Sequence, residues 1–275
     1  MIAVDYSGIA IAAVMAQIKD SELDLESCRH FILNSIRSIR KELRNSKNGD
    51  IVICADAGNS WRKDIFPYYK ASRKASRDNS GLDWNEIYSN INTVYKELET
   101  SFPYKCIRVA RSEADDILSI LSKNITDEEH VIVSNDKDMV QLNMRPNVRV
   151  YSTRKASFVV EDNYEKALFT HILTGDTGDG VPNVLSDDDT FVVKEKRQRQ
   201  LRKTAIESFW LGDLPLPYHY ERNKKLISLF EIPEDIEKAI MEEYNSYEIK
   251  GKRSNLLSYM AKNNLRDLLE KVGDF

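Results

Sequence analysis

Short, mainly apolar runs alternate with longer amphipathic segments over the first 150 or so residues of the chain. The short runs lie at 1–4, 51–54, 106–109, 131–133 and 148–151. Their length is typical of buried strands and too short for helices. Between them, apolar side chains recur at helical spacing over 22–44, 87–98 and 114–121. This alternation indicates βαβ units, so we expect an α/β fold with a mostly parallel sheet flanked by helices.

The pattern changes after residue 164. Helical periodicity continues at 224–230, 234–244 and 254–271, and Val192-Val193 is the one β-branched pair in this part of the sequence. We therefore expect a smaller helical domain after the α/β domain. Three Asp residues followed by a basic run occupy 187–203, where we expect a mobile linker.

The composition fits a globular protein. Of the 275 residues, 41% are hydrophobic and 31% are charged, which suits a sizeable core under a charged surface. No apolar segment is long enough to span a membrane, and Asp5 interrupts the first apolar run, which argues against a signal peptide. Cys28, Cys54 and Cys106 form no Cys-x-x-Cys pair, so we expect neither a disulfide scaffold nor a thiolate zinc site. These features favour a reducing, cytoplasmic compartment.

Charge is unevenly distributed along a chain whose formal net charge is −4. Two short segments are strongly basic. The segment 62–77 contains Arg62, Lys63, Lys70, Arg73, Lys74 and Arg77 against the single acid Asp64, and 194–203 contains six cations against Glu195. Local basic segments of this kind keep a nucleic-acid partner open despite the mild overall acidity.

The acids gather where the predicted strands end. Asp5, Asp56 and Asp136 follow three of the apolar runs, and Asp138 comes two residues after Asp136. Further acids open the helix after 106–109 or lie in the glycine-rich loop 175–180; these are Glu113, Asp115, Asp116, Asp176 and Asp179. Singly, each could be a turn former or a helix cap. Together, nine carboxylates would meet at one edge of a parallel sheet.

Carboxylates gathered in this way repel one another and need a cationic partner. Hard divalent cations prefer oxygen ligands, and a pair of such ions is a common apparatus for phosphodiester hydrolysis. The four His residues (His30, His130, His171 and His219) show no zinc or triad spacing, and we interpret them as structural. The sequence therefore favours a two-metal site built from carboxylates.

In order along the chain, these motifs resemble the flap endonuclease/5′-nuclease family. The matching segments are Val4-Asp5, Ala55-Asp56, Glu113-Ala114-Asp115-Asp116, Ser134-Asn135-Asp136-Lys137-Asp138 and Gly175-Asp176-Thr177-Gly178-Asp179-Gly180. The stretch 61–73 is similar to the part of the family that leads into a helical arch. The resemblance covers about residues 1–183 and is strongest to bacteriophage members with ribonuclease H activity.

This resemblance implies a PIN-like catalytic domain over 1–183, with an arch around 62–84, and a small helical domain over 184–275. It implies two Mg²⁺ ions, which Mn²⁺ can replace. Five residues match the positions of the first metal: Asp5, Asp56, Glu113, Asp115 and Asp136. Three residues match the positions of the second metal: Asp138, Asp176 and Asp179. Asp116 matches a further acid of bacterial and phage members.

The basic stretch gains roles from the same resemblance. Lys70 matches a residue that approaches the scissile phosphate, and Arg62 would assist it. The nucleic-acid contacts implied by the resemblance are Arg62, Lys63, Tyr69, Lys70, Arg73, Lys74 and Arg77. One segment departs from the family: Pro182 is followed by 183–189 without the glycine-rich hairpin that grips duplex DNA. The run 194–203 either takes over that contact or is a solvated charged helix face.

The implied activity is 5′-3′ hydrolysis of RNA–DNA hybrid, duplex or 5′-flap DNA, as in primer removal during DNA replication. Implied partners are nucleic acids with 5′ ends or flaps and a replication single-strand-binding protein. The resemblance also favours a monomeric phage protein in the bacterial host cytoplasm.

Three alternative functions are considered, and the sequence gives a reason against each. A PIN-type single-strand ribonuclease shares the fold but carries fewer acids and no arch. A metal-dependent binding module would use Asp5-Tyr6-Ser7, yet Ile9 occupies its third ligand position. A phosphatase with Asp5 as nucleophile would need a second acid where Ser7 stands.

Overall fold

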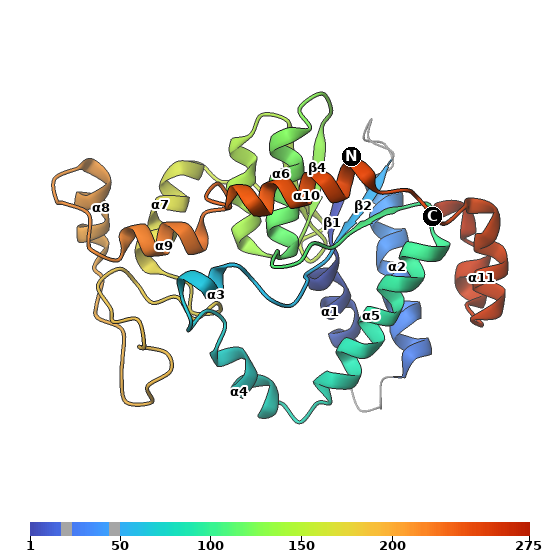
Figure 1. The fold of residues 1–275 in the computed structure, drawn as a ribbon, viewed down its shortest axis with the longest axis horizontal. Helices are drawn as coiled ribbons and strands as arrows, with labels where there is room; N and C mark the ends of the chain where they lie inside the picture. Colours follow the sequence, from blue (N-terminus) through green and yellow to red (C-terminus); the bar gives the residue numbers. More distant parts are fainter. Residues whose placement is uncertain (18–23, 44–49) are drawn as a thin grey trace.

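The sheet is mostly parallel, as predicted. The computed structural model describes residues 1–17, 24–43 and 50–275, and in these residues it contains a six-stranded sheet of order β3-β2-β1-β4-β5-β6 (Figure 1). The strands are β1 (Ile2–Asp5), β2 (Ile51–Cys54), β3 (Lys105–Ile107), β4 (His130–Val133), β5 (Val148–Ser152) and β6 (Ser157–Phe158). The first five are parallel, and β6 runs antiparallel to β5. The five predicted strands are confirmed, and β6 is an addition.

Helices cover both faces of this sheet. Because successive strand residues point to opposite sides, Ile2, Val4 and Ile53 pack under α1 (Tyr6–Met15), α2 (Leu25–Leu43) and α5 (Trp84–Ser101). Ala3 and Val52 pack on the other side, under α6 (Ala114–Asn124). The predicted helix 22–44 corresponds to α2, although residues 22, 23 and 44 lie outside the described residues.

The C-terminal part is mainly helical, as expected, and spreads over both faces. Its elements are α7 (Tyr164–Thr174), α8 (Lys203–Leu211), α9 (Tyr220–Ile227), α10 (Glu234–Ser246), α11 (Leu256–Lys262) and α12 (Arg266–Leu269). Ile236 and Ile240 of α10 join the core beneath α6, whereas Met260 and Leu268 join the core beneath α2. Figure 1 shows α10 lying across α6 and α11 at the far end, beside α2. The division at residue 183 stays a prediction.

The segment 187–203 differs from one of its two predicted forms. It forms turns and extended backbone, and α8 begins only at Lys203, so the interpretation of 194–203 as a helix face is wrong. Lys196 pairs with Asp187 and Asp189, and the Asn183 side chain donates a 2.8 Å hydrogen bond to the Arg199 carbonyl. These contacts tie the segment to the loop that precedes it, and its mobility stays a prediction.

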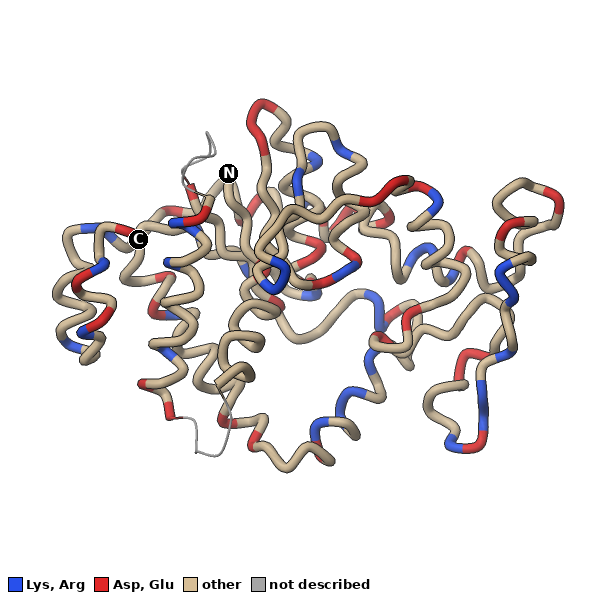
Figure 2. Tube along the Cα trace, turned by 180° about the vertical axis from the view of Figure 1, so that it is seen from behind, with Lys and Arg blue, Asp and Glu red and all other residues tan. Residues whose placement is uncertain are grey.

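Two short helices, α3 (Arg62–Ile65) and α4 (Ser72–Asp78), connect β2 to α5 at the position of the predicted arch. Figure 1 shows this stretch curving away from the sheet and returning along α5. Figure 2 shows Lys and Arg positions following one another along it. Among the described residues, no helix combines the length and apolar character needed to cross a membrane.

Candidate active site

The carboxyl ends of the central strands bring the predicted acids together. β1 lies between β2 and β4, so Asp5, Asp56 and Asp136 emerge side by side. The Ser134 hydroxyl donates a 2.8 Å hydrogen bond to Asp5 and accepts one of 3.1 Å from the backbone N–H of Asp136. The Ser7 hydroxyl in turn accepts a 3.2 Å hydrogen bond from the backbone N–H of Asp56. Three strand ends are thus fastened to one another.

Local sequence fixes the Asp5 carboxylate. Asp5 caps α1, and its Oδ1 accepts a 3.0 Å hydrogen bond from the backbone N–H of Gly8. A Cβ at Gly8 would lie 2.4 Å from Oδ2 of Asp5, so the close approach requires glycine. Burial, followed by the charge of Asp56, raises the pKa of Asp5 to about 6. The protein thus holds this acid where losing its proton is costly without a cation nearby.

The first turn of α6 contributes the next two acids. The Asp56 side chain accepts a 2.7 Å hydrogen bond from the backbone N–H of Ala114, which ties β2 to this turn. Burial, reinforced by the charges of Asp5 and Asp136, raises the pKa of Asp115 far above its usual range. Burial also disfavours the Glu113 carboxylate, but Lys70 and Arg62 outweigh this and lower its pKa. Glu113 is therefore already paired, whereas Asp115 forms no ion pair with a cation of the described residues.

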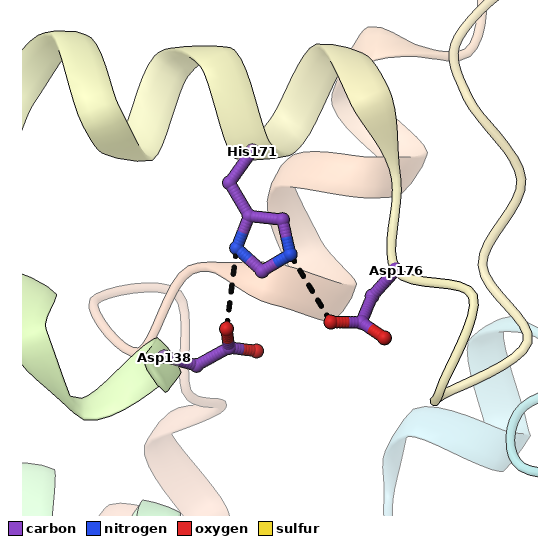
Figure 3. A group of neighbouring side chains, drawn as sticks. All are labelled: Asp138, His171 and Asp176. Atoms are coloured by element: carbon purple, nitrogen blue, oxygen red, sulfur yellow. Dashed lines mark hydrogen bonds and ion pairs between the residues drawn. The ribbon is translucent and has the colours of Figure 1, made fainter. Parts of the chain in front are cut away.

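A second group joins Asp138 and Asp176 through His171 (Figure 3). The His171 Nδ1 lies 3.4 Å from Asp138 and its Nε2 lies 3.2 Å from Asp176. Burial lowers the pKa of His171, but its hydrogen bond to Asp176 and the charge of Asp138 raise it overall. Burial raises the pKa of Asp138 to about 7, while the hydrogen bond with His171 lowers that of Asp176. Lys137 lies 3.2 Å from Asp176.

Asp179 faces the base of the arch. Its carboxylate pairs with Arg73, lies 3.8 Å from the Lys70 ammonium and lies 2.8 Å from the Tyr69 hydroxyl. The same hydroxyl is 2.9 Å from Glu113, which also pairs with Lys70. Burial disfavours the Lys70 ammonium, yet the charges of Asp179 and Glu113 raise its pKa. The arch base is therefore a positively charged cover over Glu113 and Asp179.

Two predicted site residues have a different role in the structure. Asp116 is fully buried, and its Oδ1 lies 2.9 Å from the guanidinium of Arg62, which is only 2% exposed. Arg62 also donates to the carbonyl oxygen of Leu226, and the indole of Trp61 donates to Asp116. Asp116 completes a capping box at the start of α6. The two residues therefore form an internal ion pair that joins arch, α6 and α9, a correction to their prediction as metal ligand and phosphate contact.

The other basic candidates line one cavity of about 780 Å³ beneath the arch. Lys63, Lys70, Arg73, Lys74 and Arg77 share its wall with Asp56 and Glu113. Tyr69 is an exception, because it is buried and reaches the site only through its hydroxyl. The cavity connects the acids to the basic helix of the arch. A strand of phosphates could therefore meet both at once.

The chain matches two family models. The first, "5′-3′ exonuclease, N-terminal resolvase-like domain", matches residues 11–173 and so covers more than half of the chain. The chain belongs to this 5′-3′ exonuclease family. The second model, "T4 RNase H, C terminal", matches residues 163–275. The predicted family and the PIN-like fold with a helical C-terminal part are thereby confirmed.

Individual relatives agree with this family. The chain is 32% identical over 289 aligned positions to a ribonuclease H of Enterobacteria phage T4, covering 99% of this chain and 94% of that one. It is 31% identical over 163 positions to a 5′-3′ exonuclease of Buchnera aphidicola subsp. Schizaphis graminum, covering 56% and 53% of the two chains. Among solved structures, the flap endonuclease of bacteriophage T5 in a pseudo-enzyme–product complex with DNA and metal ions shares the fold, with a TM-score of 0.63 and 14% identity over 89% of this chain and 99% of that one.

The oxygen-rich arrangement fits divalent cations. Oδ1 of Asp138 is buried and accepts no hydrogen bond from the described residues, and its contact with His171 is a 3.4 Å ion pair. A buried carboxylate oxygen without a hydrogen-bond donor suits a metal ligand. Asp5 and Asp115 are likewise held where a cation would relieve their raised pKa. One oxygen or nitrogen atom from each of Asp138, His171 and Asp176 lies within 4.8 Å of the others. Among the described residues, Asp138, His171 and Asp176 thus form a candidate metal site.

His171 is the residue that sequence reasoning misses. From the sequence alone it is interpreted as structural, because no other His or Cys stands at ligand spacing. It lies in the last turn of α7, which ends at Thr174 and is capped by Gly175, directly before Asp176. Its position in the sequence, one helical turn before an acidic loop, is the signal that could have predicted its contact with Asp176.

Proposed function

We propose that this protein is a metal-dependent 5′ nuclease that hydrolyses RNA–DNA hybrid, duplex or 5′-flap DNA, as in primer removal during DNA replication. The observation that carries the proposal is the shared cavity in which Asp56 and Glu113 face Lys70, Arg73 and Lys74. Acids alone would bind only cations, and a basic surface alone would bind only phosphates. Their juxtaposition suits hydrolysis of a phosphodiester.

Two groups of acids would hold two Mg²⁺ ions, with Mn²⁺ as a substitute. We assign Asp5, Asp56, Glu113, Asp115 and Asp136 to the first ion. Asp138, Asp176 and Asp179 are assigned to the second, with His171 orienting Asp138 and Asp176. When bound, such ions activate a water molecule and stabilise the leaving oxygen.

The arch base supplies the groups that act on the reacting phosphate. The Lys70 ammonium lies between the carboxylates of Glu113 and Asp179, and its raised pKa keeps it charged at neutral pH. Its backbone has φ of +57°, a left-handed conformation that is uncommon for a residue other than glycine. The Tyr69 hydroxyl, held between Glu113 and Asp179, supports that geometry. Lys70 would neutralise charge that develops on the phosphate.

The substrates and surroundings are part of the same proposal. The row of Lys63, Arg73 and Lys74 on one cavity wall suits the phosphates of a single strand leaving a duplex. We propose that the protein acts as a monomer in the bacterial cytoplasm, on 5′ ends or flaps, beside a replication single-strand-binding protein. The segment 194–203, anchored beside Asn183, remains a candidate for duplex contacts.

Incubation with 5′-labelled substrates tests the function. Flap, RNA–DNA hybrid, nicked duplex and single-strand oligonucleotides are compared in Mg²⁺ and in EDTA. We expect cutting of 5′-ended duplex or flap substrates in Mg²⁺ and none in EDTA. The Asp136→Asn variant controls for contaminating nucleases. Equal cutting in EDTA, or cutting confined to single-stranded RNA, would contradict the proposal.

A further inference from the structure

An aromatic pair stands at the end of the arch, away from the acids. Trp84 and Tyr88, at the start of α5, have ring centroids 5.7 Å apart and planes inclined by 36°. The Arg77 guanidinium lies 5.1 Å from the Tyr88 ring centroid and 5.9 Å from that of Trp84, within cation–π distance of both. Arg77 comes from α4, so these contacts join the two sides of the arch.

The pair is held in place by its own turn. The indole N–H of Trp84 donates a 2.7 Å hydrogen bond to the Ser80 hydroxyl, which donates to the carbonyl oxygen of Arg77 at 2.7 Å. Asp83 caps α5 through the backbone N–H groups of Asn85 and Glu86. The rings are therefore fixed before any ligand arrives, which lowers the entropy cost of binding to them.

Tyr88 lies where two cavities meet, and this position indicates a role in ligand binding. Tyr88, Arg77 and Lys74 line the cavity that contains Asp56 and Glu113 and also a second cavity of about 780 Å³, which is lined by the turn between α4 and α5. Tyr88 is only partly buried, and Arg77 forms no ion pair within the described part of the chain. A strand that passes from one cavity to the other must cross this ring and these two cations.

We propose that Tyr88, with Arg77 against it, is a base-stacking site for the single strand that extends from the cleaved end. This rests on the proposed function and adds a contact to bases, whereas Lys70 and Arg73 contact phosphates. Flat aromatic rings beside cations bind unpaired bases with little dependence on their identity. The ligand class is a single-stranded nucleic acid with at least one unstacked base.

Removing bases from the strand tests the site without changing its charge. Flap duplexes are prepared with ordinary flaps or with flaps of abasic residues, and their binding is measured in Ca²⁺ by fluorescence anisotropy. We expect wild-type protein to bind the base-bearing flap about ten-fold more tightly. The Tyr88→Ala variant should lose that preference while binding the abasic flap like wild type, and Tyr88→Phe should restore it. Tyr218→Ala, which removes a 93% exposed ring outside the arch, is the matched control.

A flap that carries 2-aminopurine gives an independent readout, because its fluorescence falls when the base stacks. Quenching that disappears in Tyr88→Ala supports the site, even if the protein cuts nothing, so this result separates the inference from the proposed function. The inference is overturned if wild-type protein binds both flaps equally. It is also overturned if Tyr88→Ala weakens the binding of both flaps equally, because Tyr88 would then only stabilise the structure of the arch. Melting temperatures identify a variant that does not fold. The comparison of the two flaps with wild-type protein tests the inference even if no variant folds.

Discussion

The backbone N–H of Lys70 donates a 2.7 Å hydrogen bond to the carbonyl oxygen of Asp179, and the Lys70 ammonium lies 3.8 Å from the carboxylate of the same residue. Arg73 adds a 3.2 Å hydrogen bond to the carbonyl of Gly178. Gly180 packs so closely that a Cβ there would lie 3.1 Å from the Tyr68 carbonyl oxygen. The arch base and the loop 175–182 are therefore in direct contact. A substitution in either should alter the conformation of the other.

Divalent cations should stabilise the fold. Bound at the folded acids, they would offset the burial, and the repulsion between neighbouring carboxylates, that raise the pKa of Asp5 and Asp115. An ion at about 100 times its Kd adds about 2.7 kcal/mol. Thermal unfolding in EDTA and at rising Mg²⁺ or Mn²⁺ measures the effect. A melting temperature that does not respond to saturating Mg²⁺ would argue against a preformed metal centre.

The two groups of acids should respond differently to substitution. Asp136→Asn removes the carboxylate of a residue whose backbone N–H is joined through the Ser134 hydroxyl to Asp5, and should nearly eliminate cutting. Asp179→Asn should leave a slow enzyme that still binds substrate, because Asp179 lies at the edge of the second group. Single-turnover rates and flap affinity separate these outcomes. If Asp136→Asn cuts within a few-fold of wild type, the centre of the site lies elsewhere.

Lys70→Ala should lower the rate of cutting more than it lowers affinity, because the ammonium is proposed to act on the reacting phosphate. Replacing Lys63 and Lys74, which face more distant phosphates, should instead weaken binding. It should also flatten the salt dependence of binding by up to about one slope unit for each phosphate that is no longer neutralised. Single-turnover kinetics and titrations at several salt concentrations distinguish the two. Wild-type behaviour of both proteins would refute the arch assignment while leaving the metal assignment standing.

Without metal, the protein should become less stable as the pH rises between about 4 and about 7. Burial raises the pKa of Asp5 to about 6 and that of Asp138 to about 7, so the folded protein keeps protons that the unfolded chain has released. Each such proton costs about 1.4 kcal/mol per pH unit within its window. The raised pKa of His171 acts in the same direction, above its unfolded value. The lowered pKa of Asp176 matters only in more acidic solution.

Thermal unfolding in EDTA across this pH range measures the slope. Asp5→Asn should reduce it, and Mg²⁺ should counteract it increasingly as the carboxylates ionise. Stability that rises with pH in EDTA would contradict the burial of these acids.

Arg62→Met should lower the free energy of unfolding by about 3–5 kcal/mol, because it leaves the fully buried Asp116 without its cation. Adding Asp116→Asn should recover part of this stability, since the remaining charge is then removed. Lys123→Met, which breaks an exposed pair with Glu237, is the matched control and should cost less than about 1 kcal/mol. Urea denaturation gives these differences. A small effect of Arg62→Met would mean that Asp116 is reached by water or by an ion.

Much of the site could be predicted from the sequence because two simple rules combine. Apolar runs such as 51–54 and 131–133 identify parallel strands, and parallel strands place the residues that follow them, Asp56 and Asp136, at one edge. The residues before α5 could be assigned to an arch only through resemblance, because 62–77 has no strong periodicity.

What the sequence could not provide is the direction of each side chain. Asp115 and Asp116 are adjacent, yet one faces the acids and the other faces Arg62, since successive positions on a helix lie about 100° apart. The helix α1 escaped prediction because its residues are almost uniformly apolar and show no polar face. The partner of Lys196 depends on a turn that no periodicity marks.

The C-terminal helices that seal both faces of the sheet have a consequence for protein synthesis. All the acids of the proposed metal centre have been made by residue 179, whereas Ile236 and Ile240 on one face, and Met260 and Leu268 on the other, are made later. Chains are made from the N-terminus, and a core that lacks its cover is incomplete. The nascent chain thus carries the acids of the proposed metal centre before the C-terminal residues that complete the core on both faces of the sheet have been made.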